Sequence, residues 1–222
     1  ALGYFQMADR IPNVVVKGLG DSLSNVAFPA YAELQGSIDR LRGAYRRIAG
    51  LSAALMMPAA VGIISIGHDF TRIFLGPKWM PMVPALLLLS AAGAVNSIVW
   101  TGRPVFMGGG RPQVVFHLQF ARAATVLLLI YPLSSRWGIA GAALAVLLSS
   151  LSSLAVYFVN IRRQFVITWR DLGLMFLPPL AASLLMAGAL WGLRMLTLPL
   201  LPGQHLLDIL WIVCMILAGG GI

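Results

Sequence analysis

The chain has 222 residues, of which 59% are hydrophobic and only 10% are charged, and its mean hydropathy is +0.86. A soluble domain carries about 25% charged residues, so this composition leaves too little polar surface to cover a water-soluble globule. A formal net charge of +9 is compatible with nucleic-acid binding, but the basic residues lie in short gaps between apolar runs. We therefore expect a membrane protein that does not bind nucleic acid.

Apolar runs of about 20 residues recur along the chain, which is the length a helix needs to cross about 30 Å of hydrocarbon. Backbone groups in lipid must bond to one another, and the alternating ten-residue strands of a barrel are absent from the sequence. The runs thus predict an all-α, polytopic membrane bundle of about seven transmembrane helices. We place the spans near residues 4–32, 48–66, 83–107, 114–133, 138–160, 172–192 and 206–222.

Lysine and arginine are unevenly distributed among the gaps between these spans. The odd gaps contain Arg40, Arg42, Arg46, Arg47, Arg103, Arg111, Arg162, Arg163 and Arg170, and the even gaps contain Arg72, Lys78, Arg136 and Arg194. Because positive charge concentrates in cytoplasmic loops, the odd gaps are expected to face the cytoplasm. The first span then runs from outside to inside.

Residues 37–48, SIDRLRGAYRRI, combine four arginines with an apolar set at helical spacing. A helix with that pattern would lie flat on an anionic cytoplasmic leaflet, with Leu41 and Tyr45 facing the lipid. The alternative, which the sequence favours, is an ordinary positively charged loop.

Polar residues recur at helical spacing along the first span: Gln6, Arg10, Asn13, Lys17, Gly20, Asp21 and Ser24. At 3.6 residues per turn they share an arc of roughly 100°. A charge near the bilayer centre costs at least about 2.5–3.5 kcal/mol on insertion scales, so these side chains need a partner or water. One interpretation is a structural ion pair between Lys17 and Asp21. The length of the stripe favours the other, the wall of a hydrophilic cavity.

Arg122 lies nine residues into the fourth span, about 13 Å deep at 1.5 Å per residue, with Gln119 and Thr125 on either side. Snorkelling to an interface is the alternative explanation, but a guanidinium at this depth is suited to bidentate contact with a phosphate. The candidate substrate-binding residues are therefore Arg10, Asn13, Lys17, Asp21, Ser24, Gln119 and Arg122.

Residue patterns that carry catalysis or bind metals do not occur. Paired carboxylates, zinc-ligand spacing and a nucleophile with its base are all missing. The lone Cys214 lies in an apolar run and predicts neither a disulfide nor a metal site. We expect no enzyme activity, no metal and no cofactor in this part of the protein.

Four landmarks follow one another in the order found in a known family. Residues 3–35, GYFQMADRIPNVVVKGLGDSLSNVAFPAYAELQ, are followed by FLGPKW at 74–79, GRP at 110–112 and WGIAGAA at 137–143. Together they resemble the bacterial polysaccharide-exporting flippases of the multidrug/oligosaccharidyl-lipid/polysaccharide superfamily. The stretch RIPN at 10–13 is also similar to a motif of the related lipid II flippases. The resemblance extends from residue 3 to about residue 160.

The resemblance implies two six-helix lobes around a central cavity, which alternate between access from the two sides of the bacterial inner membrane. Residues 1–160 would then be the C-terminal lobe without its first helix, and residues 161–222 a truncated extra pair of terminal helices. The implied substrate is an undecaprenyl-diphosphate-linked oligosaccharide for surface polysaccharide synthesis, and Arg10, Lys17 and Arg122 fit its anionic groups. Implied partners are membrane lipids, the N-terminal half of the same protein and polysaccharide polymerases.

Three other functions compete with this interpretation. A non-transporting membrane subunit is one, and the long polar stripe argues against it. A drug/cation antiporter of the same superfamily would need deep carboxylates, and Asp21 is the one candidate, beside Lys17. A polytopic glycosyltransferase or polymer ligase would need a large periplasmic loop, and no gap here exceeds about 16 residues with these span boundaries. The excess of cations favours an anionic substrate.

Overall fold

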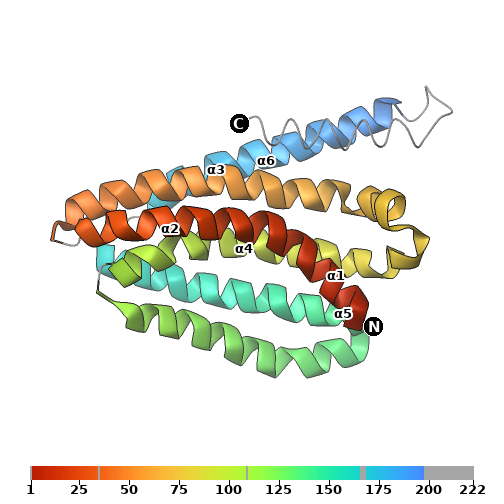
Figure 1. Cartoon of the computed structure of the whole chain (residues 1–222), viewed down its shortest axis with the longest axis horizontal. Helices are drawn as coiled ribbons and strands as arrows, with labels where there is room; N and C mark the ends of the chain where they lie inside the picture. The colour runs from red at the N-terminus through yellow and green to blue at the C-terminus, as the bar shows by residue number, and fades with distance from the viewer. Residues whose placement is uncertain (1, 35, 109, 166–168, 198–222) are drawn as a thin grey trace.

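The computed structural model describes residues 2–34, 36–108, 110–165 and 169–197, and within these ranges every regular element is helical. In chain order the elements are α1 (Leu2–Pro12), the π-helix η1 (Asn13–Lys17), α2 (Gly18–Glu33), α3 (Ile38–Phe70), the π-helix η2 (Thr71–Leu75), the 3-10 helix η3 (Pro77–Met82), α4 (Val83–Gly108), α5 (Pro112–Phe165) and α6 (Trp169–Thr197). They lie side by side as one elongated bundle (Figure 1).

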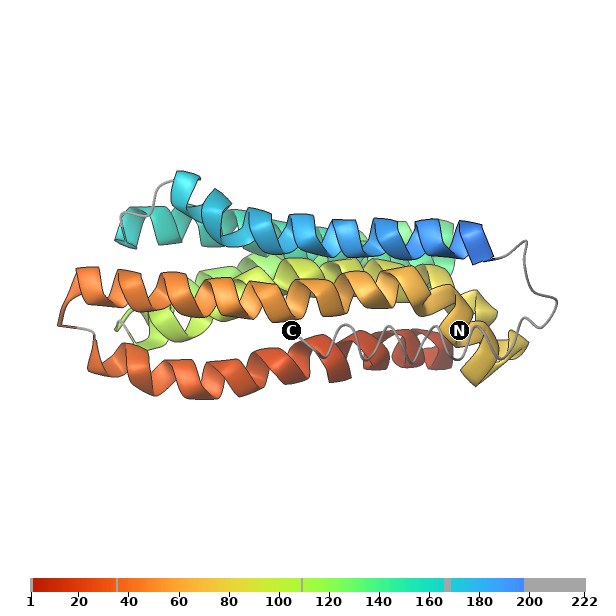
Figure 2. The ribbon, with the colours of Figure 1, turned by 90° about the horizontal axis from the view of Figure 1, so that it is seen from above.

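The fourth helix is the centre of the bundle. It packs against α1, α2, α3 and α5, whereas α3 lies between α2 and α6 (Figure 2). Within α5 the backbone of Gly138 has φ 57° and ψ −128°, a conformation open to glycine alone. There α5 reverses direction into two antiparallel halves, residues 112–137 and 139–165 (Figure 1).

Four stretches are long and apolar enough to cross a membrane: Asp39–Leu75, Pro77–Gly108, Pro112–Arg163 and Arg170–Ala189. The third has room for two crossings because of the reversal at Gly138. Six of the seven expected spans fall on helices, and the seventh, 206–222, lies outside the described residues. The expected turn after the third span is also present, since α4 ends at Gly108 and Gly110 has φ +72°.

The arginine-rich segment 37–48 is neither a surface helix nor a loop. It is the beginning of α3, which continues without interruption to Phe70. Leu41 and Tyr45 are 3% and 1% exposed and belong to the protein core. Both expectations were wrong because the apolar side of this segment has protein neighbours, α2 and α5, that a single sequence does not reveal.

Buried side chains form one cluster near each end of the bundle. The larger contains Tyr31, Tyr45, Phe106 and Tyr157, and the smaller is built around Ala8, Leu86 and Ala143. Large apolar side chains are exposed on the outside of α5 and α6, including Leu127, Leu128, Leu184, Leu185 and Trp191. So much apolar surface is typical of helices that face lipid.

Positive charge is concentrated at the end of the bundle where α2 turns into α3 and α4 into α5 (Figure 1). We call it the basic end. Its exposed arginines are Arg40, Arg46, Arg47, Arg111, Arg162, Arg163 and Arg170. The exposed basic residues of the described opposite end are Arg72, Lys78 and Arg136.

Candidate functional site

The polar stripe of the first span does not stay on one face of its helix. Gln6 and Arg10 are exposed on α1, whereas Gly20 on α2 is buried and Ser24 is half-buried. Between them lies the π-helical segment η1, directly after Pro12. A π turn adds about one residue, so the face that points to the core rotates by about 100°. The stripe is thereby divided into an outward part and an inward part.

The outward part contains Arg10 and Asp21, both exposed. Asn13 is half-buried and its amide donates to the backbone carbonyl of Asp9 at 2.9 Å, four residues earlier. Lys17 belongs to η1, but the expected pairing of Lys17 with Asp21 lies outside the described side chains. Arg10 and Asn13 are thus placed three residues apart on the first helix, with Arg10 pointing away from the core.

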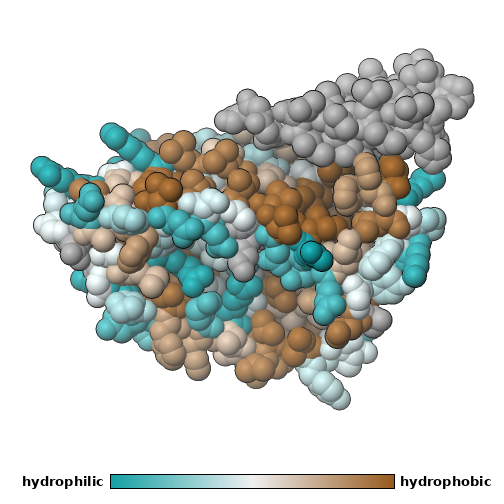
Figure 3. Space-filling view, in the orientation of Figure 1, coloured by the Kyte–Doolittle hydropathy of each residue, from teal (hydrophilic) through white to brown (hydrophobic). Residues whose placement is uncertain are grey.

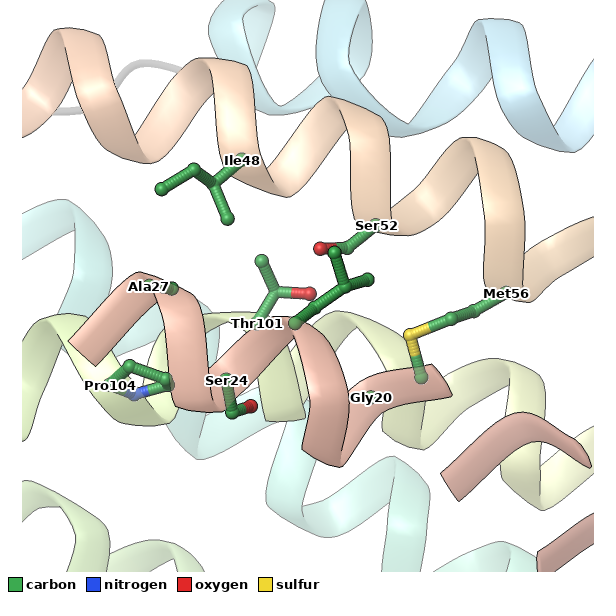
Figure 4. Close-up of a pocket in the computed structure, with 9 residues that line it drawn as sticks. Gly20, Ser24, Ala27, Ile48, Ser52, Met56, Thr101 and Pro104 are labelled. Atoms are coloured by element: carbon green, nitrogen blue, oxygen red, sulfur yellow. The ribbon is translucent and has the colours of Figure 1, made fainter. Parts of the chain in front are cut away.

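The inward part lines a small pocket between α2, α3 and α4. Ser24, Ser52 and Thr101 line it together with Gly20 and Met56 (Figure 4). The empty volume is about 220 Å³, part of it open to the surroundings, and its enclosed portion has room for about one water molecule. It is too small for a saccharide, so Ser24 is placed beside a small, mostly apolar pocket rather than a wide cavity.

Arg122 lies in the first half of α5 and is half-buried. Gln119, one turn before it, is exposed. Thr125 has a structural role, because its hydroxyl donates to Ser152 at 2.9 Å and so joins the two halves of α5. Of the two polar residues that flank Arg122, Gln119 is therefore the one whose side chain is exposed and could contact a ligand.

Two charged residues that the sequence pattern did not single out act electrostatically on Arg122. The charges of Arg103 on α4 and Asp9 on α1 both act on its guanidinium. Arg103 was counted with a cytoplasmic gap although the expected span 83–107 includes it, and the structure places it inside α4, half-buried. One signal was present in the sequence: Arg103 follows Asn96 by two helical turns and therefore shares its side of α4.

The three residues come from different helices, α4, α1 and α5. Figure 3 shows hydrophilic side chains across the middle of one face of the bundle, over the region between α2 and the first half of α5, with apolar surface above and below. Among the described residues no group of three or more metal-ligating side chains occurs. Arg103 and Arg122 therefore place positive charge within the apolar helices α4 and α5, where it is available to an anionic ligand.

Comparison with known proteins shows what the chain is similar to. Residues 1–84 match the family model described as polysaccharide biosynthesis protein. The lipopolysaccharide biosynthesis protein WzxC of Escherichia coli K12 is 26% identical over 177 residues, 75% of this chain and 35% of WzxC. A membrane protein in the cps region of Klebsiella pneumoniae is 28% identical over 138 residues, 61% of this chain and 28% of the relative. The chain is similar to proteins of bacterial polysaccharide biosynthesis.

A solved structure has a similar fold. The lipid II flippase MurJ in an inward closed conformation matches with a TM-score of 0.74 at 16% identity, over 98% of this chain and 46% of that chain. The teichuronic acid biosynthesis protein TuaB of Bacillus subtilis 168 is 25% identical over 134 residues, 60% of this chain and 27% of TuaB. The chain spans about a third of the length of the curated relatives it matches. It is a membrane protein with a MurJ-like helical fold.

Proposed function

We propose that this chain is part of a transporter that moves undecaprenyl-diphosphate-linked oligosaccharides across the bacterial inner membrane for surface polysaccharide synthesis. Two kinds of similarity support this: relatives named for lipopolysaccharide and teichuronic acid biosynthesis, and the fold of a lipid II flippase. The main observation behind the proposal is that Arg122 is half-buried in an apolar helix and that the charge of Arg103 acts on it.

The physical task of such a transporter is to shield a charged headgroup. An ionised phosphate cannot enter hydrocarbon without a very large loss of solvation, whereas the polyprenyl tail can remain in the bilayer throughout. A hydrophilic face with fixed cations replaces part of the lost solvation. Transport needs no bond to be made or broken, and we propose that this chain binds its substrate without chemistry.

The placement of charge supports an orientation. The exposed arginines of the basic end outnumber the basic residues of the opposite end, so we propose that the basic end faces the cytoplasm. We further propose that residues 1–160 are part of the C-terminal lobe of a two-lobed protein, with residues 161–222 as an additional helix pair. The N-terminal half would then supply the other wall of the cavity, and polysaccharide polymerases would act on the product.

Arg122→Ala in the full-length protein tests the proposal. In a strain that lacks the chromosomal copy, we expect the variant to leave undecaprenyl-linked saccharide on the cytoplasmic leaflet, with surface polysaccharide lowered at least tenfold (about 1.4 kcal/mol). Arg122→Lys should recover part of the activity, because a lysine keeps the charge but loses the bidentate geometry.

The matched control is Arg136→Ala, which removes an exposed arginine from the opposite end of the same half of α5. It should behave as the wild type. Normal surface polysaccharide in Arg122→Ala at wild-type protein levels would disprove the role of Arg122.

A further inference from the structure

The hydroxyl of Tyr31 is a buried hydrogen-bonding group that this arrangement of the helices leaves unused. Tyr31 lies near the end of α2 and is fully buried. Its hydroxyl has no hydrogen-bond partner among the described residues. Burying such a group without a partner costs free energy, and it is rare enough in folded proteins that each case needs an explanation.

Two other buried hydroxyls belong to the same cluster. Tyr45 of α3 and Tyr157 of α5 are members of the larger core cluster together with Tyr31, and their hydroxyls form a hydrogen bond with each other. Tyr31 and Tyr45 are also close enough to interact electrostatically. Because a phenol can accept a hydrogen bond as well as donate one, the pair keeps a free acceptor for a third hydroxyl.

The packing of α2 permits a small shift relative to its neighbours. Gly108 leaves α4 without a side chain where α2 passes, and a Cβ atom there would lie 3.1 Å from the backbone nitrogen of Ala32. One turn before Tyr31, Ala27 lines the pocket between α2, α3 and α4, whose enclosed portion has room for about one water molecule. A smooth contact next to unfilled space lets a helix slide without a collision of side chains.

Unused hydrogen-bonding capacity is concentrated at the basic end. Within the described ranges, two buried side-chain atoms have no hydrogen-bond partner, the hydroxyl oxygen of Tyr31 and Nε of Arg42. Arg42 lies one turn before Tyr45 on α3, so both atoms belong to the part of the bundle where α2 turns into α3. This end of the bundle is therefore not in the arrangement that satisfies its polar groups best.

We propose that Tyr31 is a conformational switch at the basic end. In a second arrangement of the bundle, α2 shifts and the hydroxyl of Tyr31 donates to the Tyr45–Tyr157 pair. The bond is absent from the arrangement described here, and this brings the free energies of the two arrangements closer together. The inference extends the proposed function, because transport requires two arrangements that open to opposite sides and that both have an appreciable population.

Distances between two spin labels test the switch in the full-length protein in nanodiscs. The labels are attached at Glu33→Cys on α2 and Gln113→Cys on α5, both exposed at the basic end, in a background without other cysteines. The labelled parent protein should show two distance populations. Tyr31→Phe should lower the ratio of the second population to the described one by about fivefold or more, because it removes a hydrogen bond that the second arrangement alone makes.

Two further sets of variants make the test specific. Tyr4→Phe is the matched control, because Tyr4 packs edge-on against Trp79 at the opposite end, with ring centroids 5.6 Å apart, and this variant should keep the parent ratio. Replacing Tyr45 and Tyr157 together by phenylalanine removes both partners of one hydrogen bond, which is close to neutral for stability. In that double variant Tyr31→Phe should no longer change the ratio, because its acceptor is gone.

An unchanged ratio in Tyr31→Phe would overturn the inference, and a buried water would then be the partner of the hydroxyl. A shift that persists when Tyr45 and Tyr157 are both phenylalanine would overturn it as well. So would a single distance in the parent protein both with and without undecaprenyl diphosphate. None of these outcomes contradicts the proposed function, because the Arg122→Ala experiment tests transport separately.

Discussion

Three tyrosines meet in the buried core next to the basic end. Tyr31, Tyr45 and Tyr157 come from α2, α3 and α5 and are at most 1% exposed. The hydroxyls of Tyr45 and Tyr157 form a hydrogen bond with each other, and Phe106 of α4 packs edge-on against Tyr157 at 6.0 Å. The hydroxyl of Tyr31 has no hydrogen-bond partner among the described residues. Four helices are thus joined through one partly satisfied polar cluster.

The cluster gives opposite expectations for two otherwise similar substitutions. Tyr45→Phe leaves the buried hydroxyl of Tyr157 without its partner and should lower the free energy of unfolding by about 1–3 kcal/mol. Tyr31→Phe removes a hydroxyl that is already unpaired and should be neutral or stabilising. Thermal unfolding of the purified protein in detergent measures both. Equal destabilisation by the two substitutions would contradict the hydrogen bonding described here.

At the scale of the elements, short irregular segments determine how a long apolar run folds. The reversal at Gly138 converts one apolar run into two antiparallel helices, and Gly141 lets the second half pass close to the backbone of Leu133, where a side chain would collide. These two glycines explain the WGIAGAA landmark physically. In the first helix, Pro12 and η1 play the comparable part by rotating the inward face.

The reversal predicts a strong effect of a single methyl group. Gly138→Ala forces a non-glycine residue into φ 57°, ψ −128° and should cost about 1–3 kcal/mol of stability. The matched control is Gly50→Ala in α3, where an added Cβ meets nothing within 4 Å and the substitution should gain about 0.5–1 kcal/mol. Thermal unfolding and expression level report both. A wild-type melting temperature for Gly138→Ala would show that α5 reverses by another conformation.

For the whole molecule, the connections at the basic end also fix where α6 lies. Arg42 and Arg46, one turn apart on α3, both pair with Asp171 in the first turn of α6, at 3.0 and 2.6 Å. The carboxylate is only 16% exposed, which protects the pairs from screening by solvent. The same arginines that contribute to the charge asymmetry of the bundle therefore also hold α6 against α3.

The orientation of the bundle is testable with single cysteines in a Cys214→Ala background. Gln113→Cys lies at the basic end and Ser135→Cys at the opposite end, and both positions are exposed. With the basic end in the cytoplasm, a membrane-impermeant maleimide added to intact spheroplasts should label Ser135→Cys and leave Gln113→Cys unlabelled until the cells are lysed. The reverse pattern would invert the orientation.

The sequence by itself determined most of the helical architecture. Runs of apolar residues and the glycines and prolines between them are local features, and lipid leaves a helix as the one way to satisfy the backbone of such a run. Six expected spans therefore coincide with helices. The concentration of arginines near the helix ends could also be predicted, because it depends only on their positions along the chain. The order of the family landmarks was enough to indicate the relatives found by comparison.

The tertiary structure alone decided which polar residues meet. An arc drawn on an ideal helix assigned Arg10 and Ser24 to one face, but the π turn at η1 separates them, and the packing of Leu41 and Tyr45 in the core depends on helices distant in sequence. Arg103 was counted with a cytoplasmic gap although the expected span 83–107 includes it. Electrostatic interaction acts through space between helices, so the proximity of Arg103, Asp9 and Arg122 emerges only when α1, α4 and α5 are packed together.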